Sequence, residues 1–220
     1  MQPGDEPHPV NTPPMKVVCF DFGGVLVRIC RSWKEACAKA GIDSEQLGLP
    51  AVDMLVASGH AARFQRGEIP FADFIQSEVE RLENRFTPEQ FRAVHASWLI
   101  EEVGEMTPVI DRLNQLGLLT TSLSNTDPEH WKSLSQMGVI RALQTPGLSF
   151  EYGLLKPDPA IYHEAEFRFN ACGSSILFFD DLPENIEGAV RCGWNAVLID
   201  PLEPVVPQVR RGLEAFGIEA

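Results

Sequence analysis

The chain has 220 residues, of which 44% are hydrophobic and 22% are charged, a composition that suits one α/β core with or without a smaller insert. Its formal net charge of −13 and the absence of any Lys/Arg run argue against nucleic acid or another polyanion as a partner. No apolar run approaches the roughly 18 residues of a membrane-spanning helix, and five cysteines without a CxxC pair favour reduced thiols in a cytoplasmic protein with no membrane partner.

The first segment in chain order, residues 1–14, carries five prolines among polar neighbours, which predicts a disordered lead-in. Four short apolar runs further along predict buried strands of a parallel sheet. These runs cover residues 16–21, 118–124, 176–180 and 196–200.

Helical stretches precede or separate the later strands, and each has a proline at or near its start. They cover residues 107–116, 127–137, 158–169 and 183–191. Because strands and helices alternate, the sequence predicts an α/β fold with a doubly wound, Rossmann-like parallel sheet.

The segment from 29 to 105 breaks this alternation and shows no strong strand pattern. Apolar residues recur there at spacings of three and four, over residues 71–83 and 88–100, which predicts helices. We therefore predict a core made of residues 15–28 and 106–220, with a small all-helical subdomain inserted over residues 29–105. The insert would lie over the edge of the sheet where ligands bind in open α/β folds.

Four polar groups stand at or just beyond the ends of these elements. They are Asp21-Phe22-Gly23-Gly24, Ser124-Asn125, Lys156-Pro157 and Asp180-Asp181, the last followed by Asn185. Each group alone fits a helix cap, a turn or a solvated connector. All four together, in this order, are hard to attribute to chance.

Phosphoryl transfer explains why such residue types would meet. A carboxylate can attack phosphorus and form an aspartyl-phosphate. A lysine, a hydroxyl group and backbone amides can hold the phosphoryl oxygens, whose negative charge must be neutralised. Two or three carboxylates bind Mg²⁺, which lets the anionic nucleophile approach the anionic phosphate.

With these motifs, residues 16–200 resemble the haloacid dehalogenase (HAD) superfamily, in the phosphatase-rich branch that carries a small helical cap after the first strand. The resemblance implies that Asp21 is the nucleophile and also a ligand of a Mg²⁺ cofactor. It further implies that the Gly23 carbonyl and Asp181 bind the metal, and that Asp180 and Asn185 assist directly or through water.

The resemblance also implies how the substrate is held. Ser124 and Lys156 match the residues that hold the transferring phosphoryl group, and Asn125 follows the serine as it does in many members. Gly23 and Gly24 complete the predicted phosphate-binding set. The cap, matched by residues 29–105, would close over the substrate and set specificity.

One position departs from the family pattern. Phosphatases of this kind carry a second aspartate, a general acid and base, where this chain has Gly23. The substrate could have a leaving group that needs little protonation, such as a sugar 1-phosphate. A cap residue such as His60 or His95 could supply the proton, or the protein could be slow or silent.

The function predicted on this basis is hydrolysis of a small phosphorylated metabolite, such as a sugar phosphate, by a Mg²⁺-dependent phosphatase through an aspartyl-phosphate. A metal-free 2-haloacid dehalogenase is an alternative, since such enzymes also lack the second aspartate, but they have no use for paired acids at Asp180 and Asp181. A weakly active or non-catalytic binding protein is the other alternative, supported mainly by Gly23. The oligomeric state is not predicted.

Overall fold

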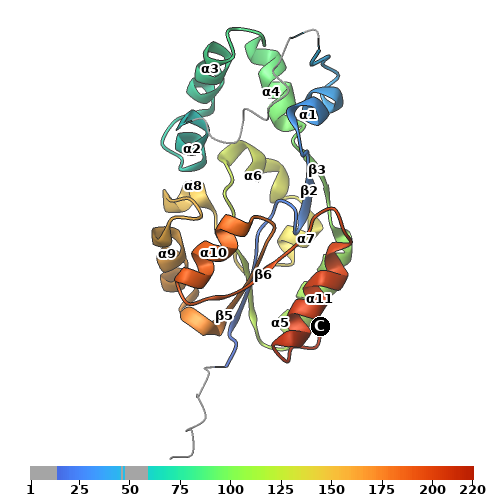
Figure 1. The fold of residues 1–220 in the computed structure, drawn as a ribbon, viewed down its shortest axis with the longest axis vertical. Helices are drawn as coiled ribbons and strands as arrows, with labels where there is room; N and C mark the ends of the chain where they lie inside the picture. The colour runs from blue at the N-terminus through green and yellow to red at the C-terminus, as the bar shows by residue number, and fades with distance from the viewer. Residues whose placement is uncertain (1–13, 46, 48–58) are drawn as a thin grey trace, which may run out of the picture.

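The computed structural model describes residues 14–45, 47 and 59–220 (Figure 1). The disordered lead-in predicted for residues 1–14 lies outside these residues, apart from Pro14.

A four-stranded parallel sheet with the order β4-β1-β5-β6 forms the centre of the larger part of the molecule (Figure 1). Its strands are β1 (Val17–Phe20), β4 (Leu119–Ser122), β5 (Ile176–Asp180) and β6 (Asn195–Leu198). The four predicted strands are therefore confirmed. The first strand lies between two that come later in the chain, as a doubly wound α/β fold requires.

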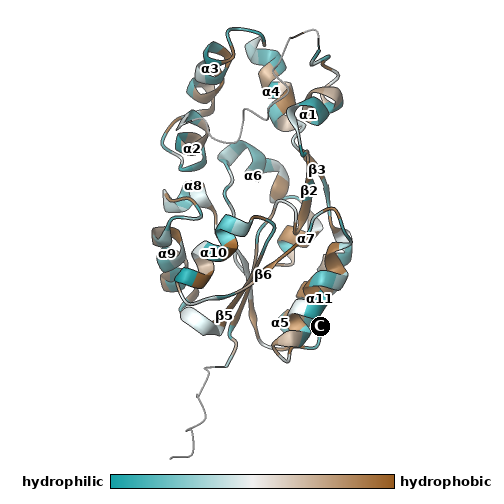
Figure 2. Ribbon diagram, in the orientation of Figure 1, coloured by the Kyte–Doolittle hydropathy of each residue, from teal (hydrophilic) through white to brown (hydrophobic). Residues whose placement is uncertain are grey.

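Helices cover both faces of this sheet because apolar residues alternate along its central strands. Val18 and Phe20 pack into one hydrophobic cluster, and Val17 and Cys19 into another. The first cluster includes residues of α5 (Thr107–Gln115) and α11 (Val205–Ala215), and the second includes residues of α9 (Pro159–Phe169) and α10 (Pro183–Arg191). Figure 2 shows hydrophobic strands flanked by helices that present both hydrophobic and hydrophilic sides.

Proline and aspartate fix the starts of several helices. Asp127 caps α6 (Pro128–Leu134) by accepting hydrogen bonds from two backbone amides, and Asp158 caps α9 in the same way through one amide. Helix α6 ends three residues earlier than predicted, because Gly138 begins the separate short helix α7 (Gly138–Arg141) rather than following a longer helix. The remaining short elements are η1 (Gly104–Met106), α8 (Ser149–Tyr152) and η2 (Gly173–Ser175).

Four helices form a separate group, which we call the helical unit, above the carboxyl end of the sheet in Figure 1. They are α1 (Trp33–Lys39), α2 (Gly59–Gln65), α3 (Phe71–Arg81) and α4 (Pro88–Ala96). They share a hydrophobic cluster of their own, built largely from aromatic side chains such as Trp33, Phe64, Phe74 and Phe91.

An antiparallel ribbon connects the helical unit to the rest of the chain. Strand β2 (Val27–Ile29) pairs with β3 (Leu99–Glu102), with Val27 opposite Glu102. The sequence does not predict this ribbon, and the helix expected over residues 88–100 ends at Ala96. Strands of three and four residues are too short to show a clear period of two.

All five cysteines are free, and Cys19, Cys30 and Cys37 are buried. Among the described residues, no helix has both the length and the apolar character needed to cross a lipid bilayer.

Candidate functional site

The four polar groups meet at the carboxyl end of the sheet. Asp21 directly follows β1, Asp180 ends β5, and Ser124 lies two residues beyond β4. These three strands are neighbours and run parallel, so their carboxyl ends lie along one edge. The loop before α9 adds Lys156, whose Nζ lies 3.0 Å from Asp21 Oδ1 and 2.6 Å from Asp180 Oδ2.

Lys156 is held in place by both its backbone and its side chain. Asn125 Nδ2 donates to the Lys156 carbonyl oxygen over 2.9 Å, and Lys156 N donates to Asn125 Oδ1 over 2.9 Å. The lysine is only 4% exposed, so it is not a solvated connector. Burial alone would lower its pKa, but the negative charges of Asp180 and Asp21 outweigh burial and raise the pKa of Lys156 above its ordinary value. The ammonium is therefore a permanent positive charge beside Asp21.

Asp180 is fully buried, and other groups already occupy its two carboxylate oxygens. Oδ1 accepts hydrogen bonds from the Leu182 amide at 2.8 Å and from Asn185 Nδ2 at 3.0 Å. Oδ2 accepts from Lys156 Nζ at 2.6 Å and from Asn185 Nδ2 at 3.1 Å. Asp180 thus fixes the lysine and the first turn of α10 relative to each other.

Asp181 reaches the site by passing close to a glycine backbone. At Gly24 the backbone angle φ is +74°, and a Cβ atom there would lie 2.3 Å from Asp181 Oδ2. Gly24 is needed both for its left-handed conformation and for this close approach. The same carboxylate oxygen forms an ion pair with Arg31 at 3.2 Å. Gly23 differs, because a Cβ atom there would meet only the flexible tip of Ile29, at 3.0 Å.

The site carries more negative charge than its cations neutralise. The pKa of Asp21 is raised to about 6, first by burial and then by the charges of Asp180 and Asp181, which together outweigh the opposite effects of Lys156 and a hydrogen bond with Ser124. The pKa of Asp181 is also raised, first by burial and then by the charge of Asp180. A bound cation would relieve this repulsion.

The donor set suits a hard divalent cation. Asp21, Asp180 and Asp181 each offer a carboxylate oxygen, and these oxygens lie within 4.8 Å of one another. Asp21 Oδ1 is buried and, although it lies 3.0 Å from the Lys156 ammonium, has no partner placed for a hydrogen bond among the described residues. Clustered oxygen donors with such an unsatisfied atom are what Mg²⁺ binds.

A cavity of about 600 Å³ opens from these residues toward the helical unit. The core lines it with Asp21, Gly23, Ser124, Asn125, Lys156 and Asp181. The helical unit and its connections line it with Arg31, Trp33, Phe64, Gln65, Phe74, Phe91, His95 and Trp98. The volume lies within the usual range for small-molecule sites, roughly 300–1,000 Å³.

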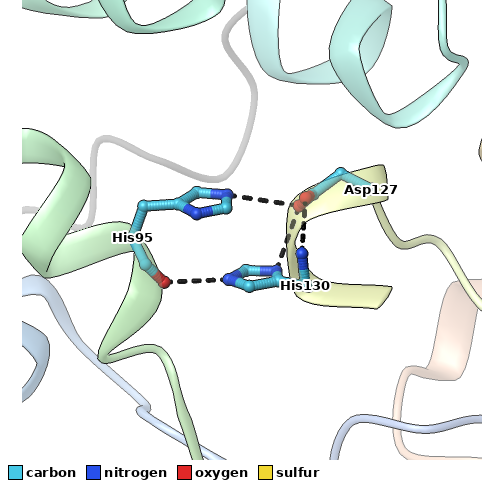
Figure 3. Close-up of side chains that lie close together, drawn as sticks. All are labelled: His95, Asp127 and His130. Carbon is cyan, nitrogen blue, oxygen red and sulfur yellow. Dashed lines mark hydrogen bonds and ion pairs between the residues drawn. The ribbon is translucent and has the colours of Figure 1, made fainter. Parts of the chain in front are cut away.

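A second polar cluster lines the same cavity and joins the two parts of the molecule (Figure 3). His95 of α4 and His130 of α6 both contact the carboxylate of Asp127. Of these three residues, the sequence analysis names only His95, as a possible proton donor. His60, the other possible donor, lies 3.6 Å from Glu78 within the helical unit. His95 and His130 are 35 positions apart in different elements, so their spacing gives no signal, although Asp127 and His130 stand at the cap and first turn of one predicted helix.

Comparison with known proteins identifies the family. The model of the haloacid dehalogenase-like hydrolases matches residues 15–193, most of the chain. The chain belongs to this family. It is a hydrolase with the α/β core that the alternation of strands and helices predicted.

Two curated proteins are similar in sequence. Phosphatase MT3486 of Mycobacterium tuberculosis is 27% identical over 152 residues, which cover 67% of this chain and 70% of that protein. Acyl-CoA dehydrogenase family member 10 of Mus musculus is 25% identical over 214 residues, which cover 88% of this chain but only 19% of that much longer protein.

Solved structures share the fold at low identity. A predicted HAD-like family hydrolase from Porphyromonas gingivalis has a TM-score of 0.75 and 22% identity, covering 90% of this chain and 98% of that one. A HAD family enzyme from Bacteroides thetaiotaomicron, in its magnesium complex, has a TM-score of 0.74 and 20% identity, covering 90% and 100%. The same enzyme is also known in complex with magnesium and inorganic phosphate. A 2-haloacid dehalogenase from Pseudomonas syringae is less similar, with a TM-score of 0.56 and 18% identity over 84% and 86% of the two chains.

Proposed function

We propose that this hydrolase is a Mg²⁺-dependent phosphatase that releases phosphate from a small phosphorylated metabolite through an aspartyl-phosphate on Asp21. The observation that carries the proposal is the buried ammonium of Lys156, fixed at 3.0 Å from Asp21 and 2.6 Å from Asp180 at the floor of the cavity. A compact, permanent positive charge beside a carboxylate nucleophile is what an anionic phosphate needs in order to approach it.

In the first step, a carboxylate oxygen of Asp21 attacks phosphorus, and the bond between phosphorus and the leaving oxygen breaks. Lys156 and Ser124 hold the phosphoryl oxygens during the transfer. In the second step, water attacks the phosphorus of the aspartyl-phosphate, which frees inorganic phosphate and restores the Asp21 carboxylate.

For the metal, we propose Asp21, Asp181 and the Gly23 carbonyl as the direct ligands. Asp180 belongs to the same group of carboxylates, but its oxygens are already engaged by Lys156, Asn185 and the Leu182 amide, so we assign it mainly to positioning. When bound, Mg²⁺ supplies positive charge that neutralises the approaching anions. Phosphatase-like relatives and magnesium complexes among the structural neighbours support this assignment.

The helical unit is proposed to be the cap, over residues 29–105, that encloses the substrate. Its aromatic side chains and the cavity volume of about 600 Å³ support a small organic group rather than a polymer. Since Gly23 has no side chain to protonate a leaving oxygen, substrates with good leaving groups, such as sugar 1-phosphates, are preferred. The cytoplasmic location expected from the free cysteines stays a prediction.

The test is phosphate release from a panel of phosphorylated metabolites and an aryl phosphate, with Mg²⁺ and with EDTA. Asp21→Asn serves as the blank, and Asp111→Asn serves as the matched control, because Asp111 is exposed on α5 and does not line the cavity. Release that needs Mg²⁺ and Asp21, and survives Asp111→Asn, supports the proposal.

Absence of release above the blank would refute the phosphatase proposal. A halide-release assay on 2-haloacids then tests the dehalogenase alternative, which shares the fold at lower similarity. If neither product forms, binding of inorganic phosphate to the metal-loaded protein tests the non-catalytic alternative.

A further inference from the structure

Three side chains form a hydrogen-bonded cluster between the helical unit and the core (Figure 3). His95 Nε2 lies 3.2 Å from Asp127 Oδ2, and His130 Nδ1 lies 3.0 Å from the same oxygen. His130 Nε2 lies 2.8 Å from the carbonyl oxygen of His95. The two imidazole rings stack with their centroids 4.0 Å apart and their planes within 6°.

The partners of His130 fix its protonation state. A carbonyl oxygen and a carboxylate oxygen can only accept hydrogen bonds, and each lies next to one ring nitrogen of His130. Both acceptors are satisfied when both ring nitrogens carry a proton, and we therefore assign His130 as an imidazolium. An imidazolium has no lone pair for a metal, so the cluster in this state is not a metal site.

His95 is in the opposite state. Its Nε2–H donates to Asp127, and a second positive ring stacked on His130 at 4.0 Å would be repelled, so His95 is neutral. The directions of the pKa shifts agree with this assignment. Burial and the charge of His130 lower the pKa of His95. Burial also tends to lower the pKa of His130, but the hydrogen bond to Asp127 and the charge of that carboxylate outweigh it and raise the pKa.

The cluster joins specific points of the two parts. His95 lies in the last turn of α4, where backbone carbonyls carry partial negative charge that an imidazolium complements. Asp127 caps α6 and stands three residues after Ser124, so it continues the loop that carries the proposed phosphate-binding serine. Both histidines and Asp127 also line the cavity.

We propose that the imidazolium of His130, together with Asp127 and His95, is the latch that holds the helical unit against the core and keeps the loop of Ser124 in position. The three are positioning residues, since no contact places them on the reacting atoms. The contact between the helical unit and the core does not depend on the proposed phosphatase function, whereas the expected change in KM rests on it.

Other charged groups lie on α6, where Glu129 pairs with Lys132 at 2.7 Å, and on α4, which carries Arg92. Glu129, on α6, is the other carboxylate whose charge acts on both histidines. From α2 and α3, the rings of Phe64, Phe71 and Phe74 pack near His95, and the Arg92 guanidinium of α4 lies over Phe71 at 4.8 Å. The balance within the cluster is therefore set mainly by the two histidines and the carboxylates of α6.

The latch has a pH window with two limits. A histidine with a raised pKa stabilises the folded contact fully below its ordinary pKa, near 6.5, and this stabilisation is lost as the pH rises through the raised pKa of His130. His95 has the opposite sign, because its protonation at low pH would stack two positive rings. The two contributions together are therefore largest near the ordinary histidine pKa of about 6.5 and weaken on either side.

The first experiment needs no substrate. Nitrogen NMR of the full chain, uniformly labelled and with its histidines assigned by through-bond correlation to the backbone, reports the protonation of each ring nitrogen. At pH 7, we expect His130 to be protonated on both nitrogens and His95 on Nε2 alone. A neutral His130 at pH 7 would overturn the proposal, even if every variant failed to fold.

The second experiment measures the coupling. Hydrogen–deuterium exchange of the α4 amides should quicken in His130→Gln, and KM for the best phosphorylated substrate should rise about tenfold while kcat changes much less. The matched control is His163→Gln, because His163 also pairs with a carboxylate three positions away, Glu166 at 3.1 Å, but is 64% exposed. Unchanged exchange in His130→Gln relative to this control would refute the latch, whereas missing phosphatase activity with faster exchange would refute only the proposed function.

Discussion

Replacing Gly23 with aspartate should accelerate hydrolysis of phosphate esters that have poor leaving groups. The new carboxylic acid would stand two residues after Asp21, where it can protonate the departing oxygen. General acid catalysis is typically worth about 10²–10⁴-fold. We expect about 10²-fold for alkyl phosphates, and little change for aryl phosphates, whose leaving groups need no proton.

The structure indicates that the backbone at Gly23 can accept a Cβ atom. Its φ lies outside the left-handed region, and the nearest atom to a Cβ at this position is Ile29 Cδ1 at 3.0 Å, the tip of a flexible side chain. Ile29 need move only a few tenths of an ångström. The loss in free energy of unfolding should therefore be about 1 kcal/mol, at the low end of the range for overpacked cores. Neighbouring Asp21, Asp180 and Asp181 would raise the pKa of the new carboxyl, which suits a proton donor.

The assay is kcat/KM for a series of phosphate esters whose leaving alcohols span a wide range of acidity. In the aspartate variant, the dependence on leaving-group acidity should become shallower. Gly23→Asn is the control for the volume of the new side chain without its acidity. Gly23→Ala is the control for the added Cβ atom alone. If the aspartate variant hydrolyses alkyl phosphates no faster than the asparagine variant does, protonation at this position is not limiting and the reasoning from Gly23 is wrong.

Three further predictions concern the charges and backbone of the site. Lys156→Met should abolish phosphate release. Because it leaves buried carboxylates without their cation, it should also reduce the free energy of unfolding by about 3–5 kcal/mol, measured by urea denaturation without metal. An unchanged urea midpoint would contradict the conclusion that Lys156 neutralises buried charge. Gly24→Ala should weaken Mg²⁺ binding, measured by calorimetry, far more than Gly153→Ala does, because both have φ of at least +70° but only the first Cβ would clash, with Asp181; equal effects would show that backbone strain alone matters. Since the pKa of Asp21 is raised to about 6, stability of the metal-free protein should fall as pH rises from about 4 to 6, and Asp21→Asn should remove that fall in thermal unfolding curves. In the wild type, kcat/KM should rise as the Asp21 carboxyl ionises, and this rise should move to lower pH as the Mg²⁺ concentration is increased. A value of kcat/KM that does not change from about pH 5 to 7 would argue against a raised pKa of Asp21.

The positions of the strands along the chain and the meeting of the four polar groups could be predicted because both follow from local patterns. Asp21, Ser124 and Asp180 each come at the end of an apolar run, and parallel packing brings such ends to one edge. The burial of Lys156 could not be predicted in this way, because it depends on hydrogen bonds to Asn125, 31 positions earlier in the chain.

The remaining features depend on contacts between distant segments. Helix α11 is not among the predicted helices, although its buried Val209 and Leu213 stand four residues apart, as on one face of a helix. The β2–β3 ribbon carries no strong periodicity, and tertiary packing decides its structure. The pairing of His95 with His130 depends on how the helical unit rests on the core. Sequence patterns within each helix contain no information about that placement.

The β2–β3 ribbon has a consequence for how such proteins diversify. Since Val27 pairs with Glu102, the chain enters and leaves the helical unit at one point, and the sheet is continuous without it. The helical unit can therefore be replaced by another of different length and sequence, in evolution or by grafting, while the sheet edge with Asp21 and Lys156 is left intact.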